Sequence, residues 1–329
     1  MRKCFFSIIT YLRVMDTFKE VSGAYQGVSD LLSKHKVLSS KYCLNSGTSM
    51  PILGFGTYQI RSHQIYETLD TALGCGYTNI DTAAVYYNEE AIGQALKDLL
   101  PKYGLQREDI FITTKLSPRD VGKSRVNDAV KRALQNLNTD YIDLFLIHWP
   151  GAQGIGTTDS QNPRLRMETW LELIDLHNKG NGVLRAIGVS NFMTHHLEQI
   201  ITLTGVPPAV NQIEFHPYYL HPKELYEVCA KHNILLQAYS SLGGTGNPTL
   251  IQNATIEECA KKHCVSPAQV LLRWALQAGY AIIPKSITPD KIRMNAKLDF
   301  ELTNEEMNLI FTLNKKFNEK FAWDPVNVM

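Results

Sequence analysis

The sequence predicts an α/β protein, a (β/α)8 TIM barrel with an N-terminal β-hairpin. Short apolar segments alternate with segments of helical length along the chain, and eight such units fit the roughly 250 residues typical of this barrel. The segment 142–147 is apolar on both faces, as in strands of a parallel sheet covered by helices. A doubly wound open sheet is the alternative, but no G-x-G-x-x-G follows any predicted strand.

The hairpin is predicted at 42–44 and 50–52, because the residues between them include Asn45-Ser46-Gly47, which suits a turn. The strands are then predicted at 53–56, 78–81, 110–114, 142–147, 184–189, 210–214, 234–238 and 281–284. The helices are predicted at 63–74, 88–99, 123–137, 166–179, 194–203, 222–232, 255–278 and, as a short helix, 288–293. The helix at 255–278 is expected to break near Ser266-Pro267. No linker is visible, so we expect an N-terminal extension at 1–40 and one barrel domain at 41–329.

Composition restricts the class of partner. Hydrophobic residues make up 44% of the chain, and the 33 Lys and Arg residues nearly balance the 32 Asp and Glu residues, for a net charge of +1. This balance predicts neither nucleic acid nor membrane as a partner. Six cysteines without a C-x-x-C pair indicate buried thiols in a reducing compartment and no metal site, so we expect a cytoplasmic protein.

The first fifteen residues leave two interpretations open. Residues 1–15 carry Arg2, Lys3 and Arg13 but no acid, which is typical of a mitochondrial presequence. Met15 could equally be a start site, and the segment would then be an extension without function. Residues 16–40 have the pattern of one weak helix and no residues that suggest chemistry.

Polar side chains recur where the predicted strands end, and a TIM barrel builds its active site at that face. Asp81, Lys115 and His148 each end a predicted strand or follow it directly, and Tyr86 lies five residues beyond Asp81. A single Asp, Lys or His in such a place is more often structural, as a helix cap or a hydrogen-bonded core residue. Their recurrence from strand to strand favours a catalytic site instead.

Seven short motifs at these strand ends resemble those of the aldo-keto reductases, in the right order from about residue 44 to 326. The motifs are DTAAVY (81–86), TKL (114–116), LIHWP (146–150), GVSNF (188–192), NQIE (211–214), AYSSLG (238–243) and IPKS (283–286). The short-loop members of the family, of the glyoxal and methylglyoxal reductase type, are the most similar. The resemblance implies NADP(H) as cofactor and a catalytic tetrad of Asp81, Tyr86, Lys115 and His148.

The chemistry of these groups agrees with the resemblance. A carbonyl that accepts hydride develops negative charge on oxygen, and Tyr86 could stabilise that charge and donate the proton. A free phenol has a pKa near 10, and we expect the Lys115 cation to lower that of Tyr86. Asp81 would pair with Lys115, and His148 would orient the carbonyl oxygen.

The resemblance also assigns binding residues. The substrate would meet Tyr58, His148 and Trp149. The cofactor residues would be Gly56, Thr57, Ser190, Asn191, Gln212, Tyr239, Ser240, Leu242, Lys285, Ser286, Lys291 and Asn295. Tyr239 would stack on the nicotinamide, with Ser190, Asn191 and Gln212 on its carboxamide. The sequence departs from the family's Arg-x-x-Glu-Asn pattern, with Lys291 in place of Arg and Met294 in place of Glu.

The expected function is NADPH-dependent reduction of small aldehydes and ketones, by a monomer. The loop after Ser240 and the segment after Trp323 are short, which favours small substrates such as 2-oxoaldehydes. Two alternatives remain open: a cofactor-binding regulatory or redox-sensing subunit of the same fold, and a structural, crystallin-like role.

Overall fold

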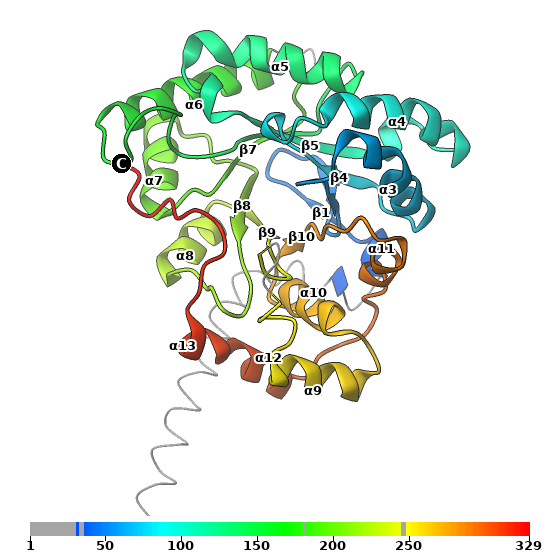
Figure 1. Ribbon diagram of the computed structural model, residues 1–329. Coiled ribbons are helices and arrows are strands. Elements are labelled where there is room, and N and C mark those ends of the chain that lie inside the picture. The colour runs from blue at the N-terminus through cyan, green and yellow to red at the C-terminus, as the bar shows by residue number, and fades with distance from the viewer. Residues whose placement is uncertain (1–30, 33–35, 180–181, 245–247) are drawn as a thin grey trace, which may run out of the picture.

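The computed structural model describes residues 31–32, 36–179, 182–244 and 248–329. Within these ranges, eight parallel strands follow one another in chain order around a barrel (Figure 1). They are β3 (Phe55–Gly56), β4 (Asn79–Asp81), β5 (Phe111–Leu116), β6 (Leu144–Ile147), β7 (Ile187–Ser190), β8 (Val210–Glu214), β9 (Leu235–Tyr239) and β10 (Ala281–Ile282). The residues of β4 to β8 are all buried, as expected of parallel strands covered by helices.

The barrel is closed by hydrogen bonds between its first and last strands. Gly54 N donates to Ile282 O at 2.8 Å, and Ile282 N donates to Ile52 O at 2.8 Å. Gly56 permits this approach, because a Cβ atom at that position would lie 2.7 Å from Ile283 O. The closed barrel brings all strand ends together at one mouth.

The hairpin of β1 (Lys41–Cys43) and β2 (Ser49–Pro51) covers the amino ends of the strands. Asn79 at the start of β4 donates Nδ2–H to Pro51 O at 2.9 Å, and Asn45 donates Nδ2–H to Pro208 O at 3.0 Å. The hairpin therefore closes the barrel opposite the mouth.

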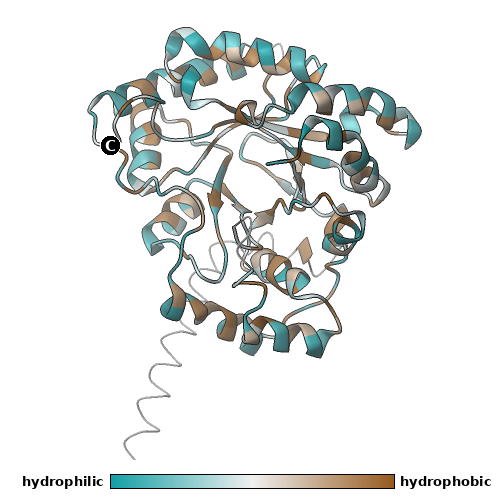
Figure 2. Ribbon diagram, in the orientation of Figure 1, coloured by the Kyte–Doolittle hydropathy of each residue, from teal (hydrophilic) through white to brown (hydrophobic). Residues whose placement is uncertain are grey.

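Helices surround the barrel, with polar residues outward and apolar residues toward the strands (Figure 2). In α5 (Lys123–Leu137), the buried residues Val126, Ala129, Val130, Ala133 and Leu137 recur at helical spacing on one face. The other helices around the barrel are α3 (Ser62–Gly74), α4 (Glu89–Lys102), α6 (Gln161–Asn178), α7 (Thr194–Thr204), α8 (Lys223–Lys231), α9 (Ala254–His263) and α10 (Pro267–Gln277). Three more helices follow β10: α11 (Pro289–Asn295), α12 (Asn304–Phe311) and α13 (Leu313–Phe317).

The predicted barrel and hairpin are confirmed, with corrections at the element ends. The expected break at Ser266-Pro267 is present, since Ser266 caps α10 by accepting from Gln269 N. Helix α6 begins at Gln161 rather than at residue 166, and the sequence analysis missed α12 and α13. Residues 1–30 and 33–35 of the predicted extension lie outside the described residues.

A search of the described residues found no helix that is both long enough and apolar enough to span a bilayer.

Candidate active site

Lys115, Asp81 and Tyr86 meet at the barrel mouth. Lys115 Nζ lies 2.7 Å from Asp81 Oδ1, 2.8 Å from Thr82 O and 3.3 Å from Tyr86 Oη. Both charged side chains are almost completely buried. Adjacent strands position them, because Asp81 ends β4 and pairs in register with Thr113 of β5.

His148 completes the group that the sequence predicts. It follows β6 directly, is buried, and its ring meets the Tyr86 ring edge-on at 5.8 Å between centroids. His148 Nδ1 has no hydrogen-bond partner among the described residues. Trp149 stacks beside His148 at 6.1 Å, and the exposed Tyr58 lies 5.0 Å from Tyr86, both between ring centroids.

The pKa of Tyr86 differs from the expectation drawn from the sequence. Burial raises the pKa of Tyr86 well above its ordinary value, and the Asp81 carboxylate raises it further. The pKa of Tyr86 is therefore raised and not lowered as the sequence predicts, because the effect of burial dominates. Burial also lowers the pKa of Lys115 itself, and it holds the pKa of His148 well below its ordinary value. At neutral pH, Tyr86 is a protonated phenol and His148 a neutral imidazole.

Gln212 joins Asp81 from the opposite side of the barrel. Its Nε2 atom donates to Asp81 Oδ2 at 2.7 Å and to Gln237 Oε1 at 2.8 Å. Lys115 and Gln212 thus each hold one oxygen of Asp81. The sequence analysis assigned Gln212 only to the cofactor and missed Gln237, whose polar side chain in a buried strand was the available signal.

A second hydrogen-bonded group lies at the ends of β7 and β9. Tyr239 Oη donates to Asn191 Oδ1 at 2.6 Å, and Asn191 Nδ2 donates to His148 O at 3.0 Å. Asn191 adopts a left-handed backbone with φ 64°, and Ser190 Oγ donates to Gln212 O at 2.8 Å. Three residues predicted for the nicotinamide therefore form one network beside His148.

The remaining predicted cofactor residues differ in what they contact. Thr57 is buried, and its Oγ1 donates to Asp81 O at 2.9 Å, so its side chain is already used within the protein. Ser240 follows β9 directly and has a left-handed backbone, with φ 54°. Leu242 is partly buried and packs against the core. Ser286 Oγ accepts from Thr288 N just before α11, where Lys291 is exposed and Asn295 is buried.

Two features of this region fit a nucleotide that carries phosphates. Lys285 is partly buried, burial lowers its pKa, and among the described residues it has no carboxylate partner. Ser241 Oγ is buried without a hydrogen-bond partner among those residues. A partly desolvated cation and an unsatisfied hydroxyl are groups that a phosphate would satisfy.

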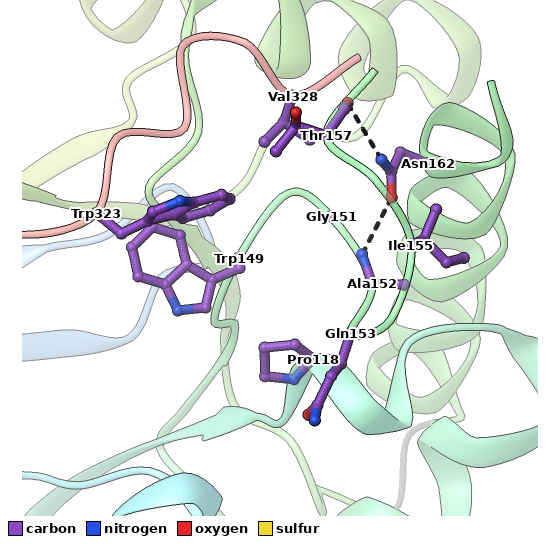
Figure 3. A pocket seen from close by; sticks show the side chains of 10 residues that line it. All are labelled: Pro118, Trp149, Gly151, Ala152, Gln153, Ile155, Thr157, Asn162, Trp323 and Val328. Carbon is purple, nitrogen blue, oxygen red and sulfur yellow. Dashed lines mark hydrogen bonds between the residues drawn. The ribbon is translucent and has the colours of Figure 1, made fainter. Parts of the chain in front are cut away.

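A cavity of about 410 Å³ opens beside Trp149. Figure 3 shows Trp149 and Trp323 together on one wall, with Ile155 and Asn162 across from them. The two indole rings meet edge-on at 4.7 Å between centroids. The sequence analysis did not assign Trp323 to the site, because it lies 174 residues from Trp149 in the chain (323 − 149).

Comparison with known proteins agrees with this architecture. The sequence matches the model of the Aldo/keto reductase family over residues 52–315, a range that includes Asp81, Tyr86, Lys115 and His148. The chain therefore belongs to the aldo/keto reductase family, a family of oxidoreductases.

The relatives include enzymes with assigned reactions. The chain is 40% identical to a glyoxal reductase of Bacillus subtilis over 83% of this chain and 92% of that protein. It is 37% identical to a glycerol 2-dehydrogenase (NADP(+)) of Saccharomyces cerevisiae over 89% of this chain and 96% of that protein. Among solved structures, an aldo-keto reductase from a Medee basin deep-sea metagenome library matches with a TM-score of 0.78 and 37% identity, covering 88% of this chain and 99% of that one.

Proposed function

We propose that this chain reduces small aldehydes and ketones to alcohols with NADPH, and that Tyr86 is the general acid. The observation that carries the proposal is the partly buried contact between Tyr86 Oη and Lys115 Nζ, at 3.3 Å, in a mouth that also holds the buried His148. When bound, NADPH would supply the hydride for the carbonyl carbon.

Tyr86 and Lys115 would then neutralise and stabilise the negative charge that develops on the carbonyl oxygen. Tyr86 carries its proton at neutral pH because its pKa is raised, so it is ready to donate. An alkoxide is a far stronger base than a phenolate, so the raised pKa does not prevent this transfer. Lys115 lies close enough to stabilise the phenolate that remains until solvent returns a proton.

His148 orients the substrate as a neutral donor. Burial and the nearby Lys115 cation lower its pKa, so its imidazole stays uncharged. A neutral imidazole donates one N–H to the carbonyl oxygen without competing with Tyr86 to supply the proton.

We assign the cofactor to the network of Ser190, Asn191 and Tyr239 and to the partly buried Lys285. Tyr239 ends β9 with its hydroxyl fixed by Asn191, which would orient its ring against the nicotinamide. Lys285 and Ser241 would meet phosphate oxygens, which fits NADPH.

The aromatic side chains at the mouth support a small, apolar carbonyl substrate. Tyr58 contacts the Tyr86 ring, Trp149 stacks beside His148 and contacts Trp323, and all three are partly or fully exposed. A glyoxal reductase among the relatives makes 2-oxoaldehydes such as methylglyoxal the first substrates to test. We expect the active form to be a monomer.

The test follows the absorbance of NADPH with methylglyoxal for wild type, Tyr86→Phe and Tyr87→Phe. Tyr86→Phe should lower turnover at least about a hundredfold, the usual effect of losing a general acid, and leave NADPH binding unchanged. Tyr87 is the matched control, since it is the adjacent tyrosine and is exposed. Near-normal turnover by Tyr86→Phe would refute the role of Tyr86. A wild type that binds NADPH without turnover would favour the regulatory or redox-sensing alternative.

A further inference from the structure

The segment 320–329 follows α13 and runs past α8 to α6 and α7 without regular structure of its own (Figure 1). Such a segment loses about 1–2 kcal/mol of backbone entropy per ordered residue, so specific contacts must hold it. The structure places these contacts at its two ends.

The first anchor is the carboxylate of Glu214, at the mouth end of β8. Its oxygens accept from Phe321 N at 2.5 Å, from Ala322 N at 3.1 Å and from Lys320 Nζ. His216 Nε2 lies 3.0 Å from the same carboxylate, which is completely buried. Burial alone would raise the pKa of Glu214, but these donors outweigh burial and lower it to about 2.

The second anchor is the buried guanidinium of Arg166, on α6. One nitrogen, Nη1, donates both to Pro150 O at 2.7 Å and to Met329 O at 2.9 Å. His196 Nε2 lies 2.8 Å from Val328 O. Because Pro150 follows Trp149, Arg166 ties segment 320–329 to the loop that carries Trp149.

Trp323 lies between the two anchors and immediately after Ala322. Its ring meets Trp149, and both line the cavity beside the mouth (Figure 3). Trp323 is nevertheless about half exposed, at 49%, so its own packing does little to fix it. The backbone bonds from Phe321 and Ala322 to Glu214 are therefore the nearest fixed points that determine where Trp323 stands.

We propose that Glu214 is a positioning residue for substrate selection: it fixes segment 320–329 so that Trp323, together with Trp149, forms a wall of the cavity beside the mouth against which a substrate would pack. Glu214 acts through Trp323 and does not itself meet the substrate. The inference rests on the proposed function, since it names the part of the site that distinguishes a bulky aldehyde from a small one. Methylglyoxal is too small to need this wall, whereas an aromatic aldehyde would pack against it.

The test compares wild type, Glu214→Gln, Lys320→Met and Trp323→Ala. Glu214→Gln keeps the shape but replaces one accepting oxygen with an NH₂ group that faces donors. Lys320→Met keeps Glu214 and removes only one partner, so it remains informative if Glu214→Gln folds poorly. Glu306→Gln is the matched control, because Glu306 in α12 is also a buried carboxylate bonded to a backbone N–H and a histidine, but these partners, Thr303 and His263, lie outside segment 320–329.

Hydrogen exchange of the peptide 320–329 provides a measurement that does not depend on activity. Exchange should become at least about tenfold faster in Glu214→Gln and in Lys320→Met, and stay unchanged in Glu306→Gln. Exchange as slow as in wild type in both anchor variants would refute the anchoring.

Steady-state kinetics measure the effect on substrate selection. For 4-nitrobenzaldehyde, Glu214→Gln and Trp323→Ala should each raise KM about tenfold, and the rise in KM for methylglyoxal should be clearly smaller in both variants. The NADPH Kd should stay within about threefold of wild type. Equal losses with both aldehydes would overturn the selective role. A wild type that reduces neither aldehyde would contradict the proposed function. The hydrogen-exchange data would then still test whether Glu214 anchors segment 320–329.

Discussion

At the residue scale, the ion pair of Asp81 and Lys115 is the most constrained feature of the site. Neither charge reaches solvent, and Lys115 Nζ has three oxygen partners within 3.3 Å. Gln212 holds the other oxygen of Asp81 at 2.7 Å. Such a pair keeps a cation beside Tyr86, but the stability of the fold then depends strongly on both partners.

Removing either partner alone should therefore destabilise the fold. Asp81→Asn leaves the Lys115 cation buried without a carboxylate, and should lower the free energy of unfolding by about 3–5 kcal/mol in urea titrations. Lys115→Met should do the same for Asp81. The double variant should recover most of the stability while remaining inactive with methylglyoxal. Additive losses in the double variant would show that the pair does not act as a unit.

At the element scale, close packing between neighbouring helices limits the choice of residue. A Cβ atom at Gly93 of α4 would lie 2.4 Å from Asn136 O and 2.6 Å from Leu137 C, at the end of α5. This contact fixes how two helices pack beside the loop that carries Tyr86 and the strand β5 that carries Lys115. Glycine is required there by the neighbouring helix, because its own backbone is ordinary helix.

Gly93→Ala should destabilise the protein although alanine is the better helix former. The intrinsic gain is about 1 kcal/mol, whereas overpacking against a backbone costs about 1–3 kcal/mol or more. We expect a net loss of at least about 1 kcal/mol in chemical denaturation. Gly156→Ala is the control, because a Cβ there meets no atom within 4 Å. Equal effects of the two substitutions would contradict the packing argument.

At the scale of the whole molecule, long-range contacts bury several histidines in their neutral form. Burial lowers the pKa of His196 to about 3 and that of His221 to about 4, and it also lowers those of His148 and His216. In the unfolded chain, each would take up a proton near pH 6.5. Their contribution to stability is therefore complete above that pH and is lost as the pH falls toward the folded values.

The free energy of unfolding should consequently fall between pH 6 and pH 4, by about 1.4 kcal/mol per pH unit for His196 and for His221, whose folded pKa values lie at about 3 and about 4. Glu214 adds a further loss only below about pH 4, where the unfolded carboxyl becomes protonated. Urea titrations across this range should show a shallower slope for His196→Gln than for wild type. The exposed His63→Gln should keep the wild-type slope, and an unchanged slope in His196→Gln would contradict the assignment.

The sequence by itself determined the barrel, the family resemblance and the residues that meet around Tyr86. These follow from local patterns, since a short apolar strand and the polar residue that ends it are adjacent in the chain. In a barrel the strand ends share one mouth, so Asp81, Lys115 and His148 could be placed together without coordinates.

Only the tertiary structure decided the bond from Gln212 to Asp81, the raised pKa of Tyr86 and the place of Trp323. Each depends on burial or on contacts between distant parts of the chain, such as Glu214 with Phe321, 107 residues apart. The tertiary structure alone also decided where α12, α13 and the segment 320–329 lie. Their positions are set by the completed barrel against which they pack, a surface that no local pattern describes.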